Sequence, residues 1–360
     1  MHRLLAAVAF AVISAGPASA VDIPADAIIN GAIDGYIRPV FHQFAGDTAA
    51  LKSDVAALCT KPTAAATAVA QAQFKTVVVT YSRLEFLRLG PLGVEDRAER
   101  LLFWPDTKGI ALKQVQSALA AKDPADADPA TLRKKSVAMQ GLNALEFVLF
   151  GTGSETLSVP EGAYRCSYGG AISSLLADLA TTLDTEWQDT SAAGPAEAML
   201  HPRSDAADYR TQQEVLEKLA GAMIVGTEVI RDQRLSPILG ASEDKPKPRS
   251  ALFWRSAMTV PSLTAGFAGL SDFFVALTLP DTLKTLGDAW ISNGALFEFK
   301  NAAQAAAKIT DPIDIAVTDQ RQLQALKYLI NLSRTLDTML GENLPAALGL
   351  TTGFSQLDGD

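Results

Sequence analysis

A carboxylate and an amide lie one helical turn apart in a strongly apolar stretch of this sequence. Residues 141–151 read GLNALEFVLFG, and Asn143 and Glu146, at positions i and i+3, share one face of a helix. A helix so apolar is expected to be buried, and a buried carboxylate must be paired, protonated or metal-bound. Two interpretations stay open: Glu146 pairs with an arginine that fixes packing, or it lines a pocket between domains. Gly141 lets another helix or a ligand approach the backbone closely.

Several common kinds of active site are excluded by the residue types that the chain lacks. Beyond residue 20 only His42 and His201 remain, so His-Glu-x-x-His and a dense His/Cys zinc cluster are absent from the sequence. No Gly-x-Ser-x-Gly elbow and no Gly-rich phosphate loop occurs. We expect the two histidines to be surface or locally bonded residues, and the sequence offers no recognisable hydrolase site.

The charge of the chain argues against polyanionic partners. Asp and Glu outnumber Lys and Arg by 40 to 31, for a formal net charge of −9. Such a chain has no electrostatic footprint for nucleic acid or for an anionic membrane surface. We therefore expect no nucleic-acid partner.

The N-terminus has the pattern of a secretory signal peptide. Arg3 supplies the positive start, Leu4–Ser14 is an apolar run too short to span a bilayer, and Ala18-Ser19-Ala20 is a cleavage site. We predict that residues 1–20 are removed, and that the mature protein is periplasmic and has no transmembrane segment.

Two cysteines, Cys59 and Cys166, remain in the predicted mature chain. An oxidising compartment allows them to form a disulfide. The alternative is two separate buried thiols, and both stay open because the sequence does not give the distance between them.

The elements that must position these residues are predicted to be helices almost throughout. Apolar residues recur with a helical period, and aromatic residues make up only 7% of the chain. The prediction is an all-α fold of two four-helix-bundle-like domains, residues 21–190 with the motif and residues 212–360, joined by a linker over 191–211. The expected helices are Ile28–Leu58, Ala64–Leu89, Thr107–Ala121, Leu132–Phe150, Ala171–Trp187, Gln212–Arg231, Val260–Leu277, Thr282–Lys308 and Asp319–Leu340.

An ordered series of matches suggests that the two domains are related by internal duplication. RLLFWPD at Arg100–Asp106 is similar to SALFWRS at Ser250–Ser256. Upstream of the first lie Glu85 and Arg88, followed by Gly90 and Pro91. The second is preceded in the same order by Glu228 and Arg231, then Pro237 and Gly240.

Together these stretches resemble the imelysin family of exported bacterial proteins. The signature of that family is Gly-x-His-x-x-Glu within an apolar helix, which Gly141, Glu146 and Gly151 match, whereas Asn143 stands in the place of the histidine. The surroundings of the two cysteines are also similar. The other matching stretches are RLGP at Arg88–Pro91, FWPD at Phe103–Asp106, FWRS at Phe253–Ser256 and the terminal GFSQLDGD at Gly353–Asp360.

The resemblance implies two helical bundles with the motif in a pocket near their interface. It also implies a role in the uptake of iron or another divalent metal, with membrane iron-uptake components as partners, and the histidine and glutamate as metal ligands. An asparagine amide is a poorer ligand than histidine for iron, copper or zinc, so Asn143 weakens that expectation. The residues expected around the pocket are Gly141, Asn143, Glu146, Arg88, Arg100, Trp104, Asp106, Trp254, Arg255 and Ser256.

Three functions follow as hypotheses. The first is a periplasmic accessory protein of metal acquisition with a ligand pocket around Glu146. The second is a module that has lost the metal and binds a small molecule or a protein. The third is a peptidase, as the family label says, although no catalytic site supports it.

Overall fold

The structure, a computed structural model, describes residues 23–240 and 245–351, and every regular element in these residues is helical. The all-α prediction is confirmed. The predicted signal peptide, residues 1–20, and the terminal segment 353–360 lie outside the described residues.

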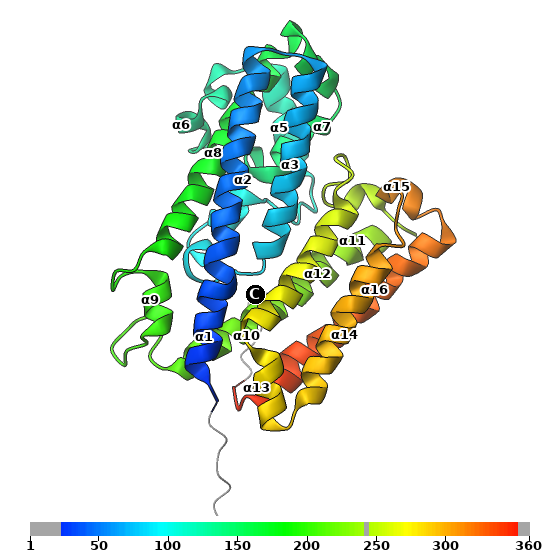
Figure 1. The fold of residues 1–360 in the computed structure, drawn as a ribbon. Helices are drawn as coiled ribbons and strands as arrows, with labels where there is room; N and C mark the ends of the chain where they lie inside the picture. The colour runs from blue at the N-terminus through cyan, green and yellow to red at the C-terminus, as the bar shows by residue number, and fades with distance from the viewer. Residues whose placement is uncertain (1–22, 241–244, 352–360) are drawn as a thin grey trace, which may run out of the picture.

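The first group of long helices packs around α2 and α8 (Figure 1). α2 contacts α3 and α8 along their lengths, and the motif helix α7 packs against the same two helices. The bounds are α1 Ala25–Ala32, η1 Ile33–Ile37, α2 Arg38–Thr60, α3 Ala64–Leu84, η2 Gly90–Gly93, α4 Arg97–Leu101, α5 Ile110–Ala121, η3 Pro124–Ala127, α6 Pro129–Leu132, η4 Val137–Met139, α7 Gly141–Phe150, η5 Ser154–Ser158, η6 Pro160–Gly162 and α8 Ala163–Gln188.

The second group forms a separate set of long helices at the lower right of Figure 1. α16 packs against α10 and α14, and α12 packs against both of those helices. The bounds are α10 Gln212–Glu228, η7 Val229–Leu235, α11 Ser236–Leu239, η8 Pro248–Ser250, α12 Thr259–Ala276, α13 Leu279–Leu286, α14 Ala289–Ala306, α15 Ile313–Ala316, α16 Gln320–Thr338, η9 Met339–Asn343 and α17 Leu344–Ala347. Residues 191–211, predicted as a linker, contain the short helix α9 (Pro195–Leu200). The domain boundaries and the internal duplication stay predictions.

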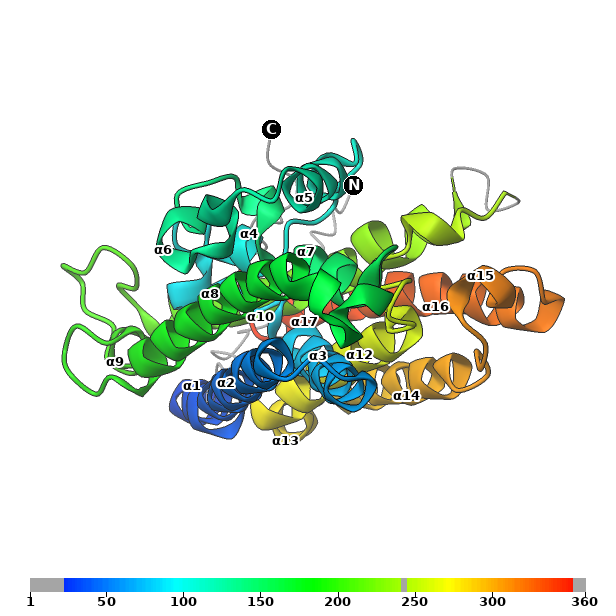
Figure 2. The same cartoon turned by 90° about the horizontal axis from the view of Figure 1, so that it is seen from above.

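The two groups meet where α12 lies along α3, as seen from above in Figure 2. The contact is close because α12 presents a glycine: a Cβ on Gly269 would lie 2.8 Å from the backbone of Arg83. Tyr36 donates a hydrogen bond to the Arg83 carbonyl at the same place. In the described part of the chain, no single helix is long and apolar enough to cross a bilayer, although α12 and α13, bent by 55° at their break, pass that test as a pair.

Three π-helical turns share one sequence cause. The turns η1, η7 and η9 each end two residues before a proline, namely Pro39, Pro237 and Pro345. Proline has no N–H to donate to the carbonyl four residues earlier, and its ring crowds that carbonyl, so the helix widens instead of continuing regularly. The kink expected at Pro39 therefore takes the form of the turn Ile33–Ile37.

Two predicted helices are wrong in their bounds. The helix expected over Leu132–Phe150 begins only at Gly141, because the buried amide of Gln140 donates hydrogen bonds to the carbonyls of Leu132 and Lys135 and holds the preceding segment in turns. The helix expected over Thr282–Lys308 is two helices, α13 and α14. Gly287, with φ of 89°, ends the first of them in the left-handed conformation.

A disulfide joins Cys59 at the end of α2 to Cys166 near the start of α8. Of the two alternatives that the sequence left open, the structure has the bonded pair. The bond ties together the ends of two helices that also pack along their lengths.

Candidate functional site

A cavity of about 690 Å³ lies where the two groups of helices meet. The first group contributes α7, α5 and the loop between α4 and α5. The second contributes α11, the segment 247–255 and two residues of α16. Of the residues predicted for the pocket, six line this cavity: Trp104, Asp106, Asn143, Glu146, Trp254 and Arg255.

Glu146 is held in the wall of the cavity by Ser256, which comes from the other group of helices. The side chain of Glu146 is buried, and its Oε1 accepts hydrogen bonds from the Ser256 backbone N–H at 2.9 Å and from its hydroxyl at 2.7 Å. Burial raises the pKa of Glu146, and the Ser256 hydrogen bonds and the charge of Arg255 oppose that rise without cancelling it.

The hydroxyl of Ser256 would also be compatible with a protonated Glu146. Its single hydrogen has two acceptors in reach, Glu146 Oε1 and the Phe253 carbonyl at 3.1 Å. A protonated Glu146 removes this competition, because it donates to Ser256 Oγ while Ser256 donates to the carbonyl. Burial is the larger influence on Glu146, so its pKa lies above the ordinary value despite these hydrogen bonds.

The turn that carries Ser256 has a strained backbone. Phe253 and Ala257, at its two ends, both have φ of 58°, a left-handed conformation that costs a residue with a Cβ about 1–2 kcal/mol. Such strain persists only where surrounding packing enforces it, and it gathers at functional sites. The turn presents Trp254 and Arg255 to the cavity while Phe253 is fully buried.

Asn143 has one oxygen without a partner. Its Nδ2 donates a hydrogen bond of 3.1 Å to the Phe103 carbonyl, which fixes the orientation of the amide. Its Oδ1 is buried and accepts no hydrogen bond among the described residues. Because Asn143 lines the cavity, this unpaired acceptor lies just behind the cavity surface.

Trp104 is positioned by the π-helical turn of the second group. Its indole Nε1 donates a hydrogen bond of 2.8 Å to the carbonyl of Gln233. That carbonyl lies four residues before Pro237, which cannot donate to it. A proline in one group of helices thus creates the acceptor that holds a cavity tryptophan from the other group.

Asp106 and Gly141 have structural roles beside the cavity. Both carboxylate oxygens of Asp106 accept backbone N–H groups at the start of α5, from Ile110 at 2.7 Å and Ala111 at 2.9 Å. Gly141 has φ of 76°, and a Cβ there would lie 2.7 Å from the Leu101 carbonyl oxygen. The signature glycine therefore allows α7 to begin directly against the end of α4.

Arg88 and Arg100 do not reach Glu146, so the prediction that either pairs with it is corrected. Arg100 binds the Asp96 carboxylate through two nitrogens, both at 2.8 Å. Arg88 lines a different hollow of about 1280 Å³ near η2 and α10. Both arginines leave the first group of helices on a side away from the motif, which a linear sequence does not reveal.

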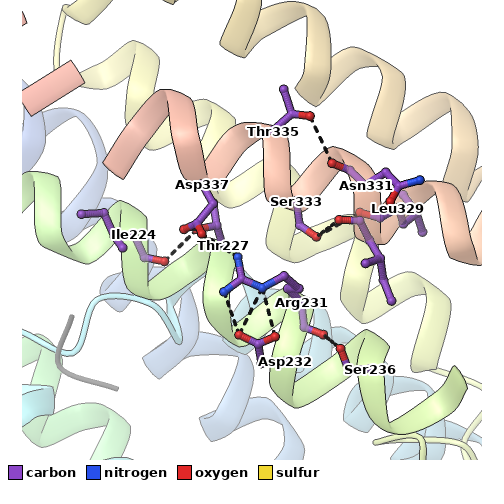
Figure 3. Close-up of polar contacts among 11 residues, drawn as sticks. Ile224, Thr227, Arg231, Asp232, Ser236, Leu329, Asn331, Ser333, Thr335 and Asp337 are labelled. Atoms are coloured by element: carbon purple, nitrogen blue, oxygen red, sulfur yellow. Dashed lines mark hydrogen bonds and ion pairs between the residues drawn. The ribbon is translucent and has the colours of Figure 1, made fainter. Parts of the chain in front are cut away.

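Arg231, which the duplication hypothesis matched to Arg88, is held by acids of its own group (Figure 3). It donates to Asp337 at 2.6 Å and to Asp232 at 2.8 Å, and Thr227 donates to the other oxygen of Asp337. This network joins η7 to α16 and is part of the packing of the second group rather than of the cavity.

Three basic residues of the cavity were missed by sequence reasoning: Lys247, Arg249 and Arg334. Lys247 and Arg249 belong to the run KPKPR just before the second Leu-Phe-Trp triplet, a local signal that could have drawn attention. Arg334 comes from α16, and its sequence neighbourhood carries no comparable signal. His42 and His201 lie on the surface, beside Asp184 and Glu197.

Comparison with known proteins decides the family. A family model described as imelysin matches residues 37–338. The chain belongs to the imelysin family. No match is found among curated protein sequences.

Two solved structures have the imelysin fold of this chain at low sequence identity. An imelysin-like protein from Psychrobacter arcticum 273-4 has a TM-score of 0.77 and 17% identity, over 93% of this chain and 99% of that one. A protein of Parabacteroides distasonis ATCC 8503, described as an iron-regulated protein A precursor, has a TM-score of 0.72 and 14% identity, over 88% and 93%. At such identities the likeness shows the fold.

The imelysin signature of this chain is a poor set of ligands for a bare metal ion. Asn143 replaces the histidine, burial raises the pKa of Glu146, and Asp106 is engaged in capping α5. Among the described residues, no three His, Cys, Asp or Glu side chains gather closely enough to hold a metal ion. The arrangement can instead offer hydrogen-bond donors and acceptors to a small molecule.

Proposed function

We propose that this imelysin-family chain is an exported, periplasmic accessory protein of iron or other metal acquisition, and that it binds a small ligand in the cavity around Glu146. The observation that carries the proposal is Asn143 Oδ1, a buried acceptor on the cavity wall without a partner among the described residues. An acceptor left unpaired costs about 1–3 kcal/mol, and a ligand donor would recover it.

The metal enters this proposal as cargo. The family and the iron-regulated neighbour from Parabacteroides distasonis support a link to iron. The donor set around Glu146 does not suit a bare ion, so we propose that iron arrives within a complex whose organic part the cavity recognises. The protein would then pass the complex to membrane components of uptake.

The alternative function is a binding module that has lost its connection to metal. One observation favours it: Arg255 lies beside Glu146, and in the described part of the chain the only other carboxylate that lines the cavity is the helix-capping Asp106. The two functions share the pocket and differ in whether the bound molecule carries a metal.

The test is a thermal-shift and calorimetry screen on the mature chain. The panel holds iron complexes of small organic ligands, the same ligands without iron, and free iron, copper, zinc and calcium ions. We expect an iron complex to stabilise the native protein and Asn143→Ala to abolish that effect. The matched control is Asn301→Ala, which changes an asparagine of α14 away from the cavity.

Each outcome has a meaning. Equal binding of a ligand with and without iron favours the alternative module. Tight, stoichiometric binding of a free ion that Glu146→Gln removes would overturn the assignment of metal as cargo. If no ligand binds in a way that depends on Asn143, the assignment of the pocket itself is overturned.

A further inference from the structure

Two arginines converge on one indole in the wall of the cavity. The guanidinium carbon of Arg255 lies 4.5 Å from the Trp254 ring centroid, and that of Arg249 lies 5.7 Å from the same ring. Arg255 also lies 5.3 Å from the ring of Phe147. Neither guanidinium is hydrogen-bonded to a carboxylate within residues 23–240 and 245–351.

Aromatic faces hold these guanidinium groups without using their N–H donors. A guanidinium stacked on a ring keeps the edge of its planar fork free, and this edge matches the two oxygens of a carboxylate or phosphate. Arg255 and Arg249 are thus prepositioned donors rather than members of structural ion pairs.

The other basic side chains of the cavity add to the positive charge of the two arginines. Lys247 and Arg334 also line it, which makes four cationic side chains with Arg249 and Arg255. Among the described residues that line the cavity, two acids stand against them, Asp106 and Glu146. Asp106 caps α5 through both oxygens, and Glu146 is buried against Ser256.

The arginines repel one another when the cavity holds no counter-charge. Burial lowers the pKa of Arg255, the nearby charge of Arg249 lowers it further, and Glu146 alone opposes the change. Both guanidinium groups remain charged at neutral pH. An anion bound between them would relieve the repulsion, whereas a cation would add to it.

We infer that the ligand of this cavity is a small organic anion whose carboxylate or phosphate oxygens bind Arg249 and Arg255 and whose hydroxyl or amino group donates to Asn143 Oδ1. This inference rests on the proposed function, since it names the chemical class of the ligand for the same pocket. A cavity of about 690 Å³ is of the size that holds such molecules. Trp104 and Trp254 provide apolar walls for the carbon skeleton.

The experiment measures the affinity of the mature chain for four probes by calorimetry. Citrate carries carboxylates and a hydroxyl, inorganic phosphate carries only anionic oxygens, xylitol is a neutral polyol, and putrescine is a dication. We expect citrate or phosphate to bind and the other two to bind at least about tenfold more weakly, with affinity that falls as salt rises. Tighter binding of citrate would assign a carboxylate ligand, and tighter binding of phosphate would assign a phosphate ligand.

The variants separate charge from fold. Arg249→Gln and Arg255→Gln should each weaken the bound anion at least about tenfold, and Arg255→Lys should weaken it less because the charge remains. The matched control, Arg321→Gln, removes a positive charge from the exposed start of α16 and should stay within about twofold. Circular dichroism of each variant establishes that it is folded.

The results also distinguish this inference from the function on which it rests. Binding of xylitol or putrescine that Asn143→Ala removes, without binding of either anion, upholds the pocket and overturns the anion. The inference is also overturned if an anion binds but neither Arg249→Gln nor Arg255→Gln changes its affinity. If no probe and no member of the wider panel binds in a way that depends on Asn143, the proposed function fails first.

Discussion

Glu146 occupies a position where an ionised carboxylate is costly. It is 3% exposed, and its hydrogen-bond partners among the described residues are both groups of Ser256. The pKa of Glu146 therefore lies above its ordinary value of 4.5 in the folded protein. At the residue scale, burial therefore makes ionisation of this carboxyl group less favourable than it is in water.

The raised pKa of Glu146 predicts how the stability of the protein changes with pH. The raised pKa stabilises the fold fully below pH 4.5, and that contribution is lost as pH rises through the folded pKa of Glu146. Glu146→Gln keeps an acceptor for Ser256 and cannot ionise. We expect the melting temperature of the variant to rise relative to that of the native protein as the pH increases above 4.5. The control is Glu161→Gln at an exposed position, and a parallel course of all three curves would contradict the prediction.

At the scale of elements, contacts between distant segments carry the site. The turn Phe253–Ala257 reaches α7 through Ser256, and η7 reaches the loop before α5 through Trp104. A third such contact is the pair of Glu85, at the end of α3, with Arg234 in η7; both residues are buried. These contacts join the two groups of helices close to the cavity.

Breaking the buried pair on one side should be expensive. Glu85→Leu leaves the guanidinium of Arg234 buried without its carboxylate, and we expect a loss of about 3–5 kcal/mol in the free energy of unfolding. The double variant Glu85→Leu, Arg234→Met should recover much of that loss, since it leaves no isolated charge. Urea denaturation measures both.

The half-buried pair of Arg97 with Glu186, which water reaches, is the control. Glu186→Gln should cost less than about 1 kcal/mol, because water solvates the remaining arginine. Equal losses for Glu85→Leu and Glu186→Gln would show that burial does not set the value of the pair.

The disulfide between α2 and α8 makes the second prediction at this scale. Cys59 and Cys166 are 107 residues apart, and a cross-link over so long a loop restricts the unfolded chain strongly. Replacing both cysteines by alanine should lower the free energy of unfolding by about 2–5 kcal/mol. Reduction of the native protein should lower the melting temperature similarly, and a reductant should leave the variant unaffected. Unchanged melting after full reduction would be evidence against this role.

At the scale of the whole molecule, the cavity exists because two groups of helices meet closely. The seam runs along α3 and α12, where Gly269 faces the backbone of Arg83 and the hydroxyl of Tyr36. A side chain on that face of α12 would separate the groups, and the position of the 253–257 turn just before α12 depends on the same contact.

Gly269→Ala tests this dependence. Its Cβ would lie 2.8 Å from the Arg83 backbone, so we expect a loss of about 1–3 kcal/mol in stability. The matched control is Gly46→Ala in α2, where a Cβ meets nothing within 4 Å and alanine should add up to about 1 kcal/mol through helix propensity. Chemical denaturation of both variants gives the comparison, and a neutral Gly269→Ala would mean that the seam can relax.

Sequence by itself determined the features that depend on near neighbours. The period of apolar residues predicted the all-α fold, and the spacing of Asn143 and Glu146 predicted that they share a face. Pro39 and Pro237 are the local cause of two of the π-helical turns, which the apolar period alone does not predict. Where the prediction erred, as before Gly141, the buried side chain of Gln140 held the preceding backbone in turns through hydrogen bonds that the apolar period does not reveal.

Only the tertiary structure decided which distant residues meet. The sequence named Arg88, Arg100, Arg255 and Ser256 as possible residues of the pocket, and packing brought the last two to Glu146. Tertiary packing likewise decided that Cys59 pairs with Cys166 and that basic residues gather in the cavity. The physical reason is that the choice follows from the packing of whole helix faces, a sum of many weak contacts between segments a hundred or more residues apart.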